Sequence, residues 1–241
     1  MTEYASITKE GDRSINEDYI GNITLEGTHL FCLADGLGGH GKGEVASEIV
    51  VKESISAFKS NDKSDTLAKC FMQAQENLLK KQIKENSRDE MKSTLTLLLL
   101  KAKSALWGHV GDSRIYLFRK SKLFTRTLDH SVPQMLVSTG EINEKDIRFH
   151  EDRNRLIRVM GMEWNTPKYA LSEEIATQSG DAFLLCSDGF WELIDEKEMS
   201  KLLKKSKSPE GWLSAMEEVV LKNGRGKNMD NYSATAIFIK G

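Results

Sequence analysis

The sequence predicts an α+β protein in which antiparallel sheets and helices form separate layers. Short apolar runs follow one another with tight turns between residues 94 and 127, the segments with helical spacing come in pairs, and strands and helices do not alternate along the chain. Consecutive strands joined by short turns pair antiparallel, whereas regular alternation with helices would indicate βαβ units and a parallel sheet. We therefore expect a layered sandwich.

The first third of the chain is expected to hold short strands followed by two helices. Residues 3–35 contain β-like pieces joined by the polar segment 8–18. Apolar residues in 44–59 and again in 64–85 recur at intervals of three and four, which is typical of helices with one buried face.

The middle of the chain reads as a strand meander, and the end returns to a mixture of strands and helices. The meander strands are expected at Thr94–Lys101, Ser104–Val110, Ser113–Arg119 and Lys122–Thr127. Residues 131–166 are mixed, polar and partly helical. The remaining expected elements are a strand at 182–187, helices at 195–206 and 209–223, and a strand at 234–239.

Bulk properties exclude several classes of protein. A chain of 241 residues gives one or two domains as a prior, and the formal net charge of −2 favours neither nucleic acid nor an anionic membrane. No apolar run reaches the roughly 18 residues of a transmembrane helix, and the N-terminus does not resemble a signal peptide. Three cysteines, Cys32, Cys70 and Cys186, fit a reducing cytoplasm better than a disulfide scaffold.

Acidic residues stand where apolar runs begin or end. Asp35 and Asp188 each close a run, Asp112 separates two runs, and Asp230 precedes the last one. Carboxylates held on rigid strand ends repel one another unless a cation lies between them, and carboxylate oxygens suit Mg²⁺ or Mn²⁺. Arg13, if it reaches this centre, indicates a phosphate ligand. The pattern predicts metal-assisted phosphoryl chemistry.

The glycine-rich segment Gly36–Gly43 admits three functional interpretations. A dinucleotide-binding loop is disfavoured because no β-branched strand follows the next helix to supply the ribose-binding acid. A phosphate loop of a nucleoside triphosphatase is disfavoured because Gly43 occupies the position that needs a Ser or Thr hydroxyl. In the third interpretation the glycines let the Gly36 carbonyl join Asp35 in binding a metal. A plain glycine turn before a helix stays open as the alternative.

Taken together, the motifs resemble the metal-dependent protein phosphatases, the type 2C Ser/Thr class, and are most similar to its compact bacterial branch. They occur in the family's order across residues 5–240: Arg13-x-x-Asn16-Glu17-Asp18, Ala34-Asp35-Gly36-x-Gly38-Gly39-His40-x-x-Gly43-Glu44-x-Ala46-Ser47, Gly111-Asp112-Ser113-Arg114, Asp129-His130-Ser131, Ser187-Asp188-Gly189-Phe190-Trp191-Glu192 and Asp230-Asn231. The resemblance implies a four-layer α-β-β-α sandwich of two antiparallel sheets flanked by helix pairs. It also implies one phosphatase domain over residues 1–241, with a small flap subdomain at 132–165.

The same resemblance implies a role for each motif residue. Asp35 would bridge two metal ions, Asp188 and Asp230 would complete one ion's protein ligands, and the Gly36 carbonyl would bind the other ion, with Glu17 and Asp18 holding its waters. Asp112 with Asp188 resembles the pair that binds a third ion in bacterial relatives. Arg13 matches the phosphate-binding arginine. Leu37 stands where some members place a general-acid histidine, and His40 fits the bacterial pattern.

The implied activity is a metal-dependent serine/threonine phosphoprotein phosphatase that uses two Mn²⁺ or Mg²⁺ ions. In this hypothesis a water or hydroxide between the ions attacks phosphoserine or phosphothreonine in line, without a covalent intermediate. No cysteine is followed by the x₅-Arg cradle of cysteine phosphatases. The expected partners are phosphorylated proteins, including a Ser/Thr kinase or its substrates, and the expected state is a monomer. The alternatives are an inactive relative that acts as a phosphoprotein- or kinase-binding adaptor and, more weakly, a phosphatase of small esters.

Several polar residues have structural interpretations instead. Asp129-His130-Ser131 is predicted to be a turn, since adjacent residues cannot converge as a hydrolytic triad. Trp191 is predicted to anchor packing, and His109 to be a structural histidine. The Lys-rich run at 201–207 is predicted to be a solvated helix face.

Overall fold

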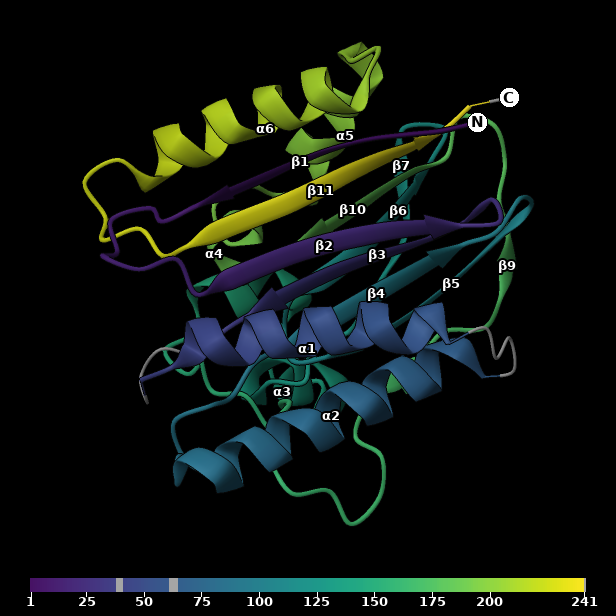
Figure 1. Ribbon diagram of the computed structural model, residues 1–241. Coiled ribbons are helices and arrows are strands. Elements are labelled where there is room, and N and C mark those ends of the chain that lie inside the picture. The colour runs from purple at the N-terminus through teal and green to yellow at the C-terminus, as the bar shows by residue number, and fades with distance from the viewer. Residues whose placement is uncertain (38–40, 61–64, 241) are drawn as a thin grey trace.

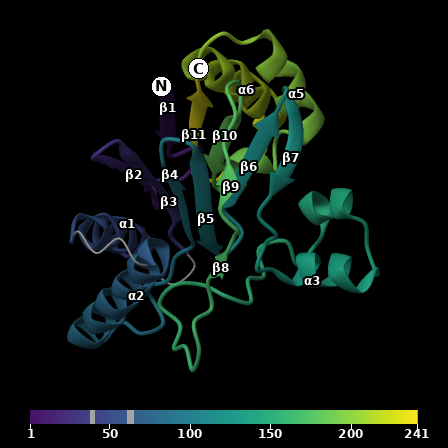
Figure 2. The ribbon, with the colours of Figure 1, turned by 90° about the vertical axis from the view of Figure 1, so that its right-hand side faces the viewer.

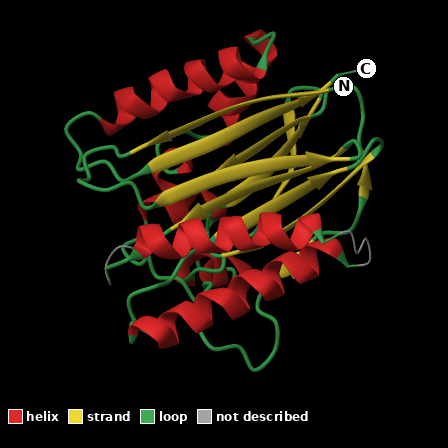
Figure 3. Cartoon of the chain, in the orientation of Figure 1, coloured by secondary structure: helices red, strands yellow, loops and turns green. Residues whose placement is uncertain are grey.

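The computed structural model describes residues 1–37, 41–60 and 65–240, and within them two antiparallel sheets pack face to face between layers of helices (Figure 1). Helices cover the outer side of each sheet, so the order of layers is helix, sheet, sheet, helix (Figure 3). The predicted α+β sandwich is confirmed. The amino and carboxyl ends of the chain lie side by side, because the first and last strands pair with each other.

The first sheet combines the two ends of the chain with the middle of the sequence. Its strand order is β1-β11-β10-β6-β7, and each neighbouring pair is antiparallel. These strands are β1 (Thr2–Lys9), β11 (Tyr232–Ile239), β10 (Ala182–Cys186), β6 (Arg114–Arg119) and β7 (Lys122–Arg126).

The second sheet is a meander with two short additions. Its order is β2-β3-β4-β5-β8, and β9 also pairs with β5. The strands are β2 (Asp18–Leu25), β3 (Thr28–Asp35), β4 (Leu95–Leu100), β5 (Ser104–Val110), β8 (Ala170–Leu171) and β9 (Ile175–Ala176). Strands β8 and β9 were not predicted, because strands of two residues have no measurable periodicity.

Each sheet is covered by a pair of long helices. Helices α1 (Gly43–Lys59) and α2 (Thr66–Glu85) lie against the second sheet, while α5 (Glu196–Lys205) and α6 (Pro209–Gly224) lie against the first. The side chains of Asp195 and Ser208 accept hydrogen bonds from the first turns of α5 and α6, which fixes where these helices begin. The bounds of these helices differ from the predicted ones by at most two residues. The predicted start of the second helix at residue 64 lies outside the described residues.

The segment predicted as mixed and partly helical lies beside the sandwich rather than in its layers. It contains α3 (Val132–Thr139) and the 3₁₀ helix η2 (Glu144–Phe149). Figure 2 shows α3 projecting next to β7, at the edge of the first sheet. Ser131 caps α3 by accepting a hydrogen bond from Gln134, so the turn predicted at 129–131 leads into this helix.

Apolar side chains fill the space between the two sheets and beneath each helix pair. The inter-sheet core includes Leu33, Leu98, Leu117, Phe183 and Ile237. Strand β4 is buried on both faces, which explains why its sequence is a nearly unbroken apolar run rather than an alternating one. The three cysteines form no disulfide, in line with the expectation, and all three are buried. Among the described residues, no helix is both long and apolar enough to cross a membrane.

Truncation of the inter-sheet core is expected to destabilise the fold strongly. Leu98 has no exposed surface, so Leu98→Ala should lower the free energy of unfolding by about 2–5 kcal/mol in urea titrations. Leu221→Ala, at an exposed position of α6, is the matched control and should change it by less than about 0.5 kcal/mol. Equal effects of the two changes would contradict the assignment of this core.

Candidate active site

The ends of strands from both sheets bring acidic residues together. Asp18 and Asp35 lie directly opposite each other across the β2–β3 pair. In the other sheet, Asp188 follows β10 and Asp230 precedes β11, and these two strands pair with each other. Asp112 lies in the turn between β5 and β6. Electrostatic interactions connect Asp35 with Asp18, Asp188 and Asp112, and Asp188 with Asp230. The structure therefore brings together Asp18, Asp35, Asp112, Asp188 and Asp230, which the sequence predicted as metal-binding residues.

Burial and mutual repulsion make these carboxyl groups hard to ionise. Burial raises the pKa of Asp35 well above its usual range, and the charges of its acidic neighbours raise it further. Burial also raises the pKa of Asp18, to about 7, and raises the pKa values of Asp112 and Asp188. The interaction between the Asp35 and Asp188 side chains raises the pKa of Asp35 further and lowers that of Asp188, because one carboxyl group can donate to the other only while it is protonated. A divalent cation would relieve the same repulsion.

One oxygen of Asp18 has a hydrogen-bond donor, whereas the other is free to contact a cation or a water bound to it. Its Oδ2 accepts a hydrogen bond from the Ser187 hydroxyl at 2.7 Å, and that hydroxyl in turn accepts from the Ser233 amide at 2.9 Å. Its Oδ1 is buried and has no hydrogen-bond partner among the described residues. A buried carboxylate oxygen without a donor is costly unless a metal or a metal-bound water satisfies it.

The donors are of the type that Mg²⁺ and Mn²⁺ prefer. In the described part of the chain, no three His, Cys, Asp or Glu side chains form a ready cluster of metal ligands. The gathered groups are carboxylates beside a backbone carbonyl, and hard ions bound by such groups commonly complete their shells with water. The residues present therefore fit a hydrated Mg²⁺ or Mn²⁺ centre.

Glycine is needed at position 36 because the backbone there is crowded from two sides. A Cβ on Gly36 would lie 2.2 Å from the Gly43 carbonyl oxygen and 2.8 Å from that of Glu17. The Gly36 amide donates to the Glu17 carbonyl at 3.0 Å, so the loop folds tightly against the segment that holds Glu17. This close approach favours the third interpretation of the glycine segment. His40 lies outside the described residues.

Arg13, in a loop near the N-terminus, contacts Asp230 of the carboxylate cluster, which lies near the C-terminus. Its guanidinium donates to both oxygens of Asp230, at 3.1 and 3.0 Å, and both side chains are about half exposed. An exposed ion pair of this kind contributes only about 0–1 kcal/mol, so Arg13 can exchange Asp230 for another oxyanion.

Asn231 holds the Arg13 loop in place, a role that sequence reasoning did not assign. Its Oδ1 accepts from the Glu17 amide at 2.8 Å, and its Nδ2 donates to the carbonyls of Glu10 and Ile15 at 2.8 and 2.9 Å. The adjacency of Asp230 and Asn231 in one motif was the available signal. The supporting hydroxyls of Thr94 and Ser187 were also missed, since single Ser and Thr residues at strand ends are too common to be diagnostic.

A buried ion pair supports the Asp112 turn from behind. Arg114 and Asp129 form a two-point contact at 2.8 and 2.6 Å, and the Arg114 guanidinium lies 3.4 Å from the ring centre of Trp191. The Trp191 indole donates to the Asp112 carbonyl at 3.1 Å. Trp191 is thus a packing anchor, as predicted, and Asp129 pairs with arginine instead of forming part of a triad.

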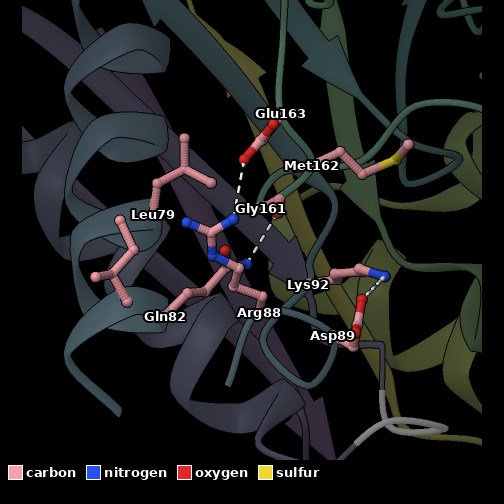
Figure 4. Close-up of a pocket in the computed structure, with 9 residues that line it drawn as sticks. Leu79, Gln82, Arg88, Asp89, Lys92, Gly161, Met162 and Glu163 are labelled. Carbon is pink, nitrogen blue, oxygen red and sulfur yellow. Dashed lines mark hydrogen bonds and ion pairs between the residues drawn. The ribbon is translucent and has the colours of Figure 1, made fainter. Parts of the chain in front are cut away.

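A groove of 430 Å³ is lined by residues of α2, of the segment 88–92 and of residues 161–163. Figure 4 shows Arg88 reaching Glu163 and Lys92 reaching Asp89 across its walls. The carbonyl of Lys92 accepts from the Leu37 amide at 3.0 Å, so the groove adjoins the candidate site.

Comparison with known proteins identifies the family. The family model described as protein phosphatase 2C matches residues 8–228, so the chain belongs to the protein phosphatase 2C family. The serine/threonine phosphatase stp of Listeria welshimeri is 33% identical over 191 residues, which cover 74% of this chain and 73% of that relative.

Solved structures agree with this assignment over the whole length. The serine/threonine phosphatase Stp1 from Staphylococcus aureus has a TM-score of 0.90 and 28% identity, and the match covers 100% of this chain and 96% of that one. The catalytic domain of the serine/threonine protein phosphatase PstP, solved in complex with two manganese ions, has a TM-score of 0.82 and 27% identity, with coverages of 100% and 99%. The expected family and sandwich are thereby confirmed.

The raised pKa of Asp18 predicts how the metal-free protein responds to pH. The unfolded chain loses this proton near pH 4, whereas the folded chain keeps it to about pH 7, so stability should fall as pH rises between these values. In chelator, wild type should lose on the order of 1–3 kcal/mol more than Asp18→Asn between pH 5 and pH 8 in urea titrations. Asp89→Asn, at an exposed position, should keep the wild-type slope; parallel profiles for wild type and Asp18→Asn would contradict this account.

Proposed function

We propose that this protein is a metal-dependent serine/threonine phosphoprotein phosphatase. The observation that supports this most is the cluster of buried, mutually repelling carboxyl groups at the joined ends of the two sheets, with Arg13 held at its edge. The names of the family relatives, which are serine/threonine phosphatases, support the same activity.

Two Mn²⁺ or Mg²⁺ ions would bind at the cluster, and the relative solved with two manganese ions supports this number. Asp35 would serve as a ligand to both ions, Asp188 and Asp230 would help to hold one, the Gly36 carbonyl would help to hold the other, and Glu17 and Asp18 would hold its waters. Asp112 and Asp188 would take a third ion. When bound, such ions polarise phosphoryl oxygens and lower the pKa of coordinated water, so hydrolysis needs no covalent enzyme intermediate.

The protein's own residues would orient the substrate and handle its charge. Arg13, released from Asp230, would bind two oxygens of the phosphoryl group, where charge is spread in the transition state. Asn231 would hold the Arg13 loop and Glu17 in position beside the carboxyl groups. His40 is proposed to protonate the leaving serine or threonine oxygen.

Phosphorylated proteins are the proposed partners, including a Ser/Thr kinase or the substrates of that kinase. The groove in Figure 4, one wall of which includes Lys92, could hold part of a polypeptide and supports polypeptide substrates over small esters. Residues 1–241 would act as one phosphatase domain with 132–165 as its flap. We further propose a monomer that works in the cytoplasm, where its three buried thiols would stay reduced.

Loss of a bridging carboxylate should abolish turnover without unfolding the protein. Phosphate release from a phosphothreonine peptide with Mn²⁺ should fall roughly 10²-fold or more in Asp35→Asn and in Asp230→Ala, and in wild type with chelator. Asp195→Asn, which changes only the cap of α5, is the matched control and should keep the wild-type rate. A wild-type rate in Asp35→Asn would exclude the metal assignment, and no release by folded, metal-loaded wild type would favour the adaptor function.

Arg13→Lys tests phosphate binding separately from metal binding. Lysine keeps the positive charge but cannot form the two-point contact, so kcat/KM for the phosphopeptide should fall roughly tenfold. Calorimetric titration with Mn²⁺ should show unchanged ion stoichiometry. An unaltered kcat/KM would argue against contact between Arg13 and the phosphoryl group.

A further inference from the structure

A second cavity opens on the side of the molecule that carries α3. It has a volume of 600 Å³ and is lined by residues of β5, of the segment from β7 to α3, of residues 157–158 and of β8. Figure 2 shows these elements next to one another at the edge of the sandwich. None of the proposed metal ligands lines it.

The rim of this cavity is unusually apolar for a protein surface. Leu128, Met135, Ile157 and Leu171 all line it, and each exposes between 43% and 57% of its surface. Clustered exposed apolar side chains around a concave surface indicate a binding site, because such side chains gain free energy when an apolar ligand covers them.

Two stacked imidazoles, both more than nine-tenths buried, form part of the wall. The rings of His109 and His130 lie 4.4 Å apart. Burial lowers the pKa of His109 and lowers that of His130 to about 3, so both rings are neutral at neutral pH. The Gly111 amide donates to Nδ1 of His130 at 3.3 Å, which leaves the proton on Nε2. Within the described chain that N–H has no hydrogen-bond acceptor.

The cavity also holds a cation without a carboxylate partner. Arg158 is exposed and lines the cavity, and no hydrogen bond or ion pair engages it among the residues that the structure describes. Its charge lowers the pKa of both histidines, so it lies within electrostatic reach of the imidazole pair. The other lining arginine, Arg126, is already paired with Glu144 and Asp129.

We propose that this cavity binds a small organic anion with an apolar body, such as an aryl carboxylate or sulfonate. The anionic group would pair with Arg158 and accept the Nε2–H of His130, while the apolar body would cover Leu128, Ile157 and Leu171. This site goes beyond the proposed phosphatase activity. The apolar rim should make the cavity select such a ligand over inorganic phosphate, because phosphate has no apolar surface to cover the rim.

The position of His130 gives the occupied cavity a direct contact with the candidate active site. The His130 amide donates to the Gly111 carbonyl at 2.9 Å, and its ring accepts from the Gly111 amide. Gly111 directly precedes Asp112. Only glycine fits there, because the φ angle is +100° and a Cβ atom would lie 2.6 Å from the Thr94 side chain. An anion bound to His130 would therefore contact the segment that fixes the Asp112 turn.

The test uses 8-anilinonaphthalene-1-sulfonate as the anionic probe and N-phenyl-1-naphthylamine as its uncharged counterpart. Fluorescence titration of the full chain, without metal or substrate, should show one saturable site for the sulfonate. Arg158→Ala should weaken sulfonate binding about tenfold and leave the uncharged probe unaffected, because only the charged contact is lost. Arg155→Ala, an exposed arginine nearby that does not line the cavity, should change neither affinity.

Leu171→Asp places a charge on the apolar wall and should abolish binding of both probes. Circular dichroism of each variant checks that it is folded. Unchanged sulfonate affinity in Arg158→Ala, or unchanged affinity of both probes in Leu171→Asp, would overturn the proposal. Since the titrations involve no turnover, and hydrolysis of a phosphopeptide is measured separately, failure of this site and failure of the phosphatase assignment are distinguishable.

Discussion

The mutual repulsion of buried carboxyl groups is the constraint on which the rest of this structure depends. Asp35, Asp112 and Asp188 lie close enough to raise one another's pKa values, in a region where burial already opposes ionisation. Such an arrangement costs free energy that only protons or cations offset, and flexible loops would simply separate the groups. It persists because each aspartate is attached to the end of a strand in a stiff sandwich. The fold thus keeps a site of high negative potential ready for divalent cations.

The sandwich achieves this by tying distant parts of the sequence to common strand ends. Pairing of β1 with β11 places the Arg13 loop beside Asp230, and Asn231 fastens that loop through three hydrogen bonds. Behind Asp112, the stacked Arg114 and Trp191 form a rigid support that is itself buried and fully paired. The site is therefore rigid around its buried carboxyl groups and adjustable at Arg13, whose exposed ion pair can exchange its partner.

The polar turn at 129–131 connects this centre with the cavity on the side of the molecule. Asp129 pairs with the arginine behind Asp112, His130 bonds to Gly111 and faces the cavity, and Ser131 begins α3. Three adjacent residues thus serve three different neighbours, which is why they cannot act as a triad. Their arrangement means that residues 129–131 line the cavity and also contact the residues on either side of Asp112.

The sequence by itself determined the longer helices and strands, the layered class and the identity of the acidic residues, because periodicity and strand-end position are local properties. It also determined the family, since several motifs in fixed order are specific together. Only the tertiary structure decided that Asp18 faces Asp35, that Asn231 holds Glu17, and that His109 and His130 stack within electrostatic reach of Arg158. These contacts depend on strand order and register between residues that are far apart in the chain, and no local pattern encodes which distant strand becomes a neighbour.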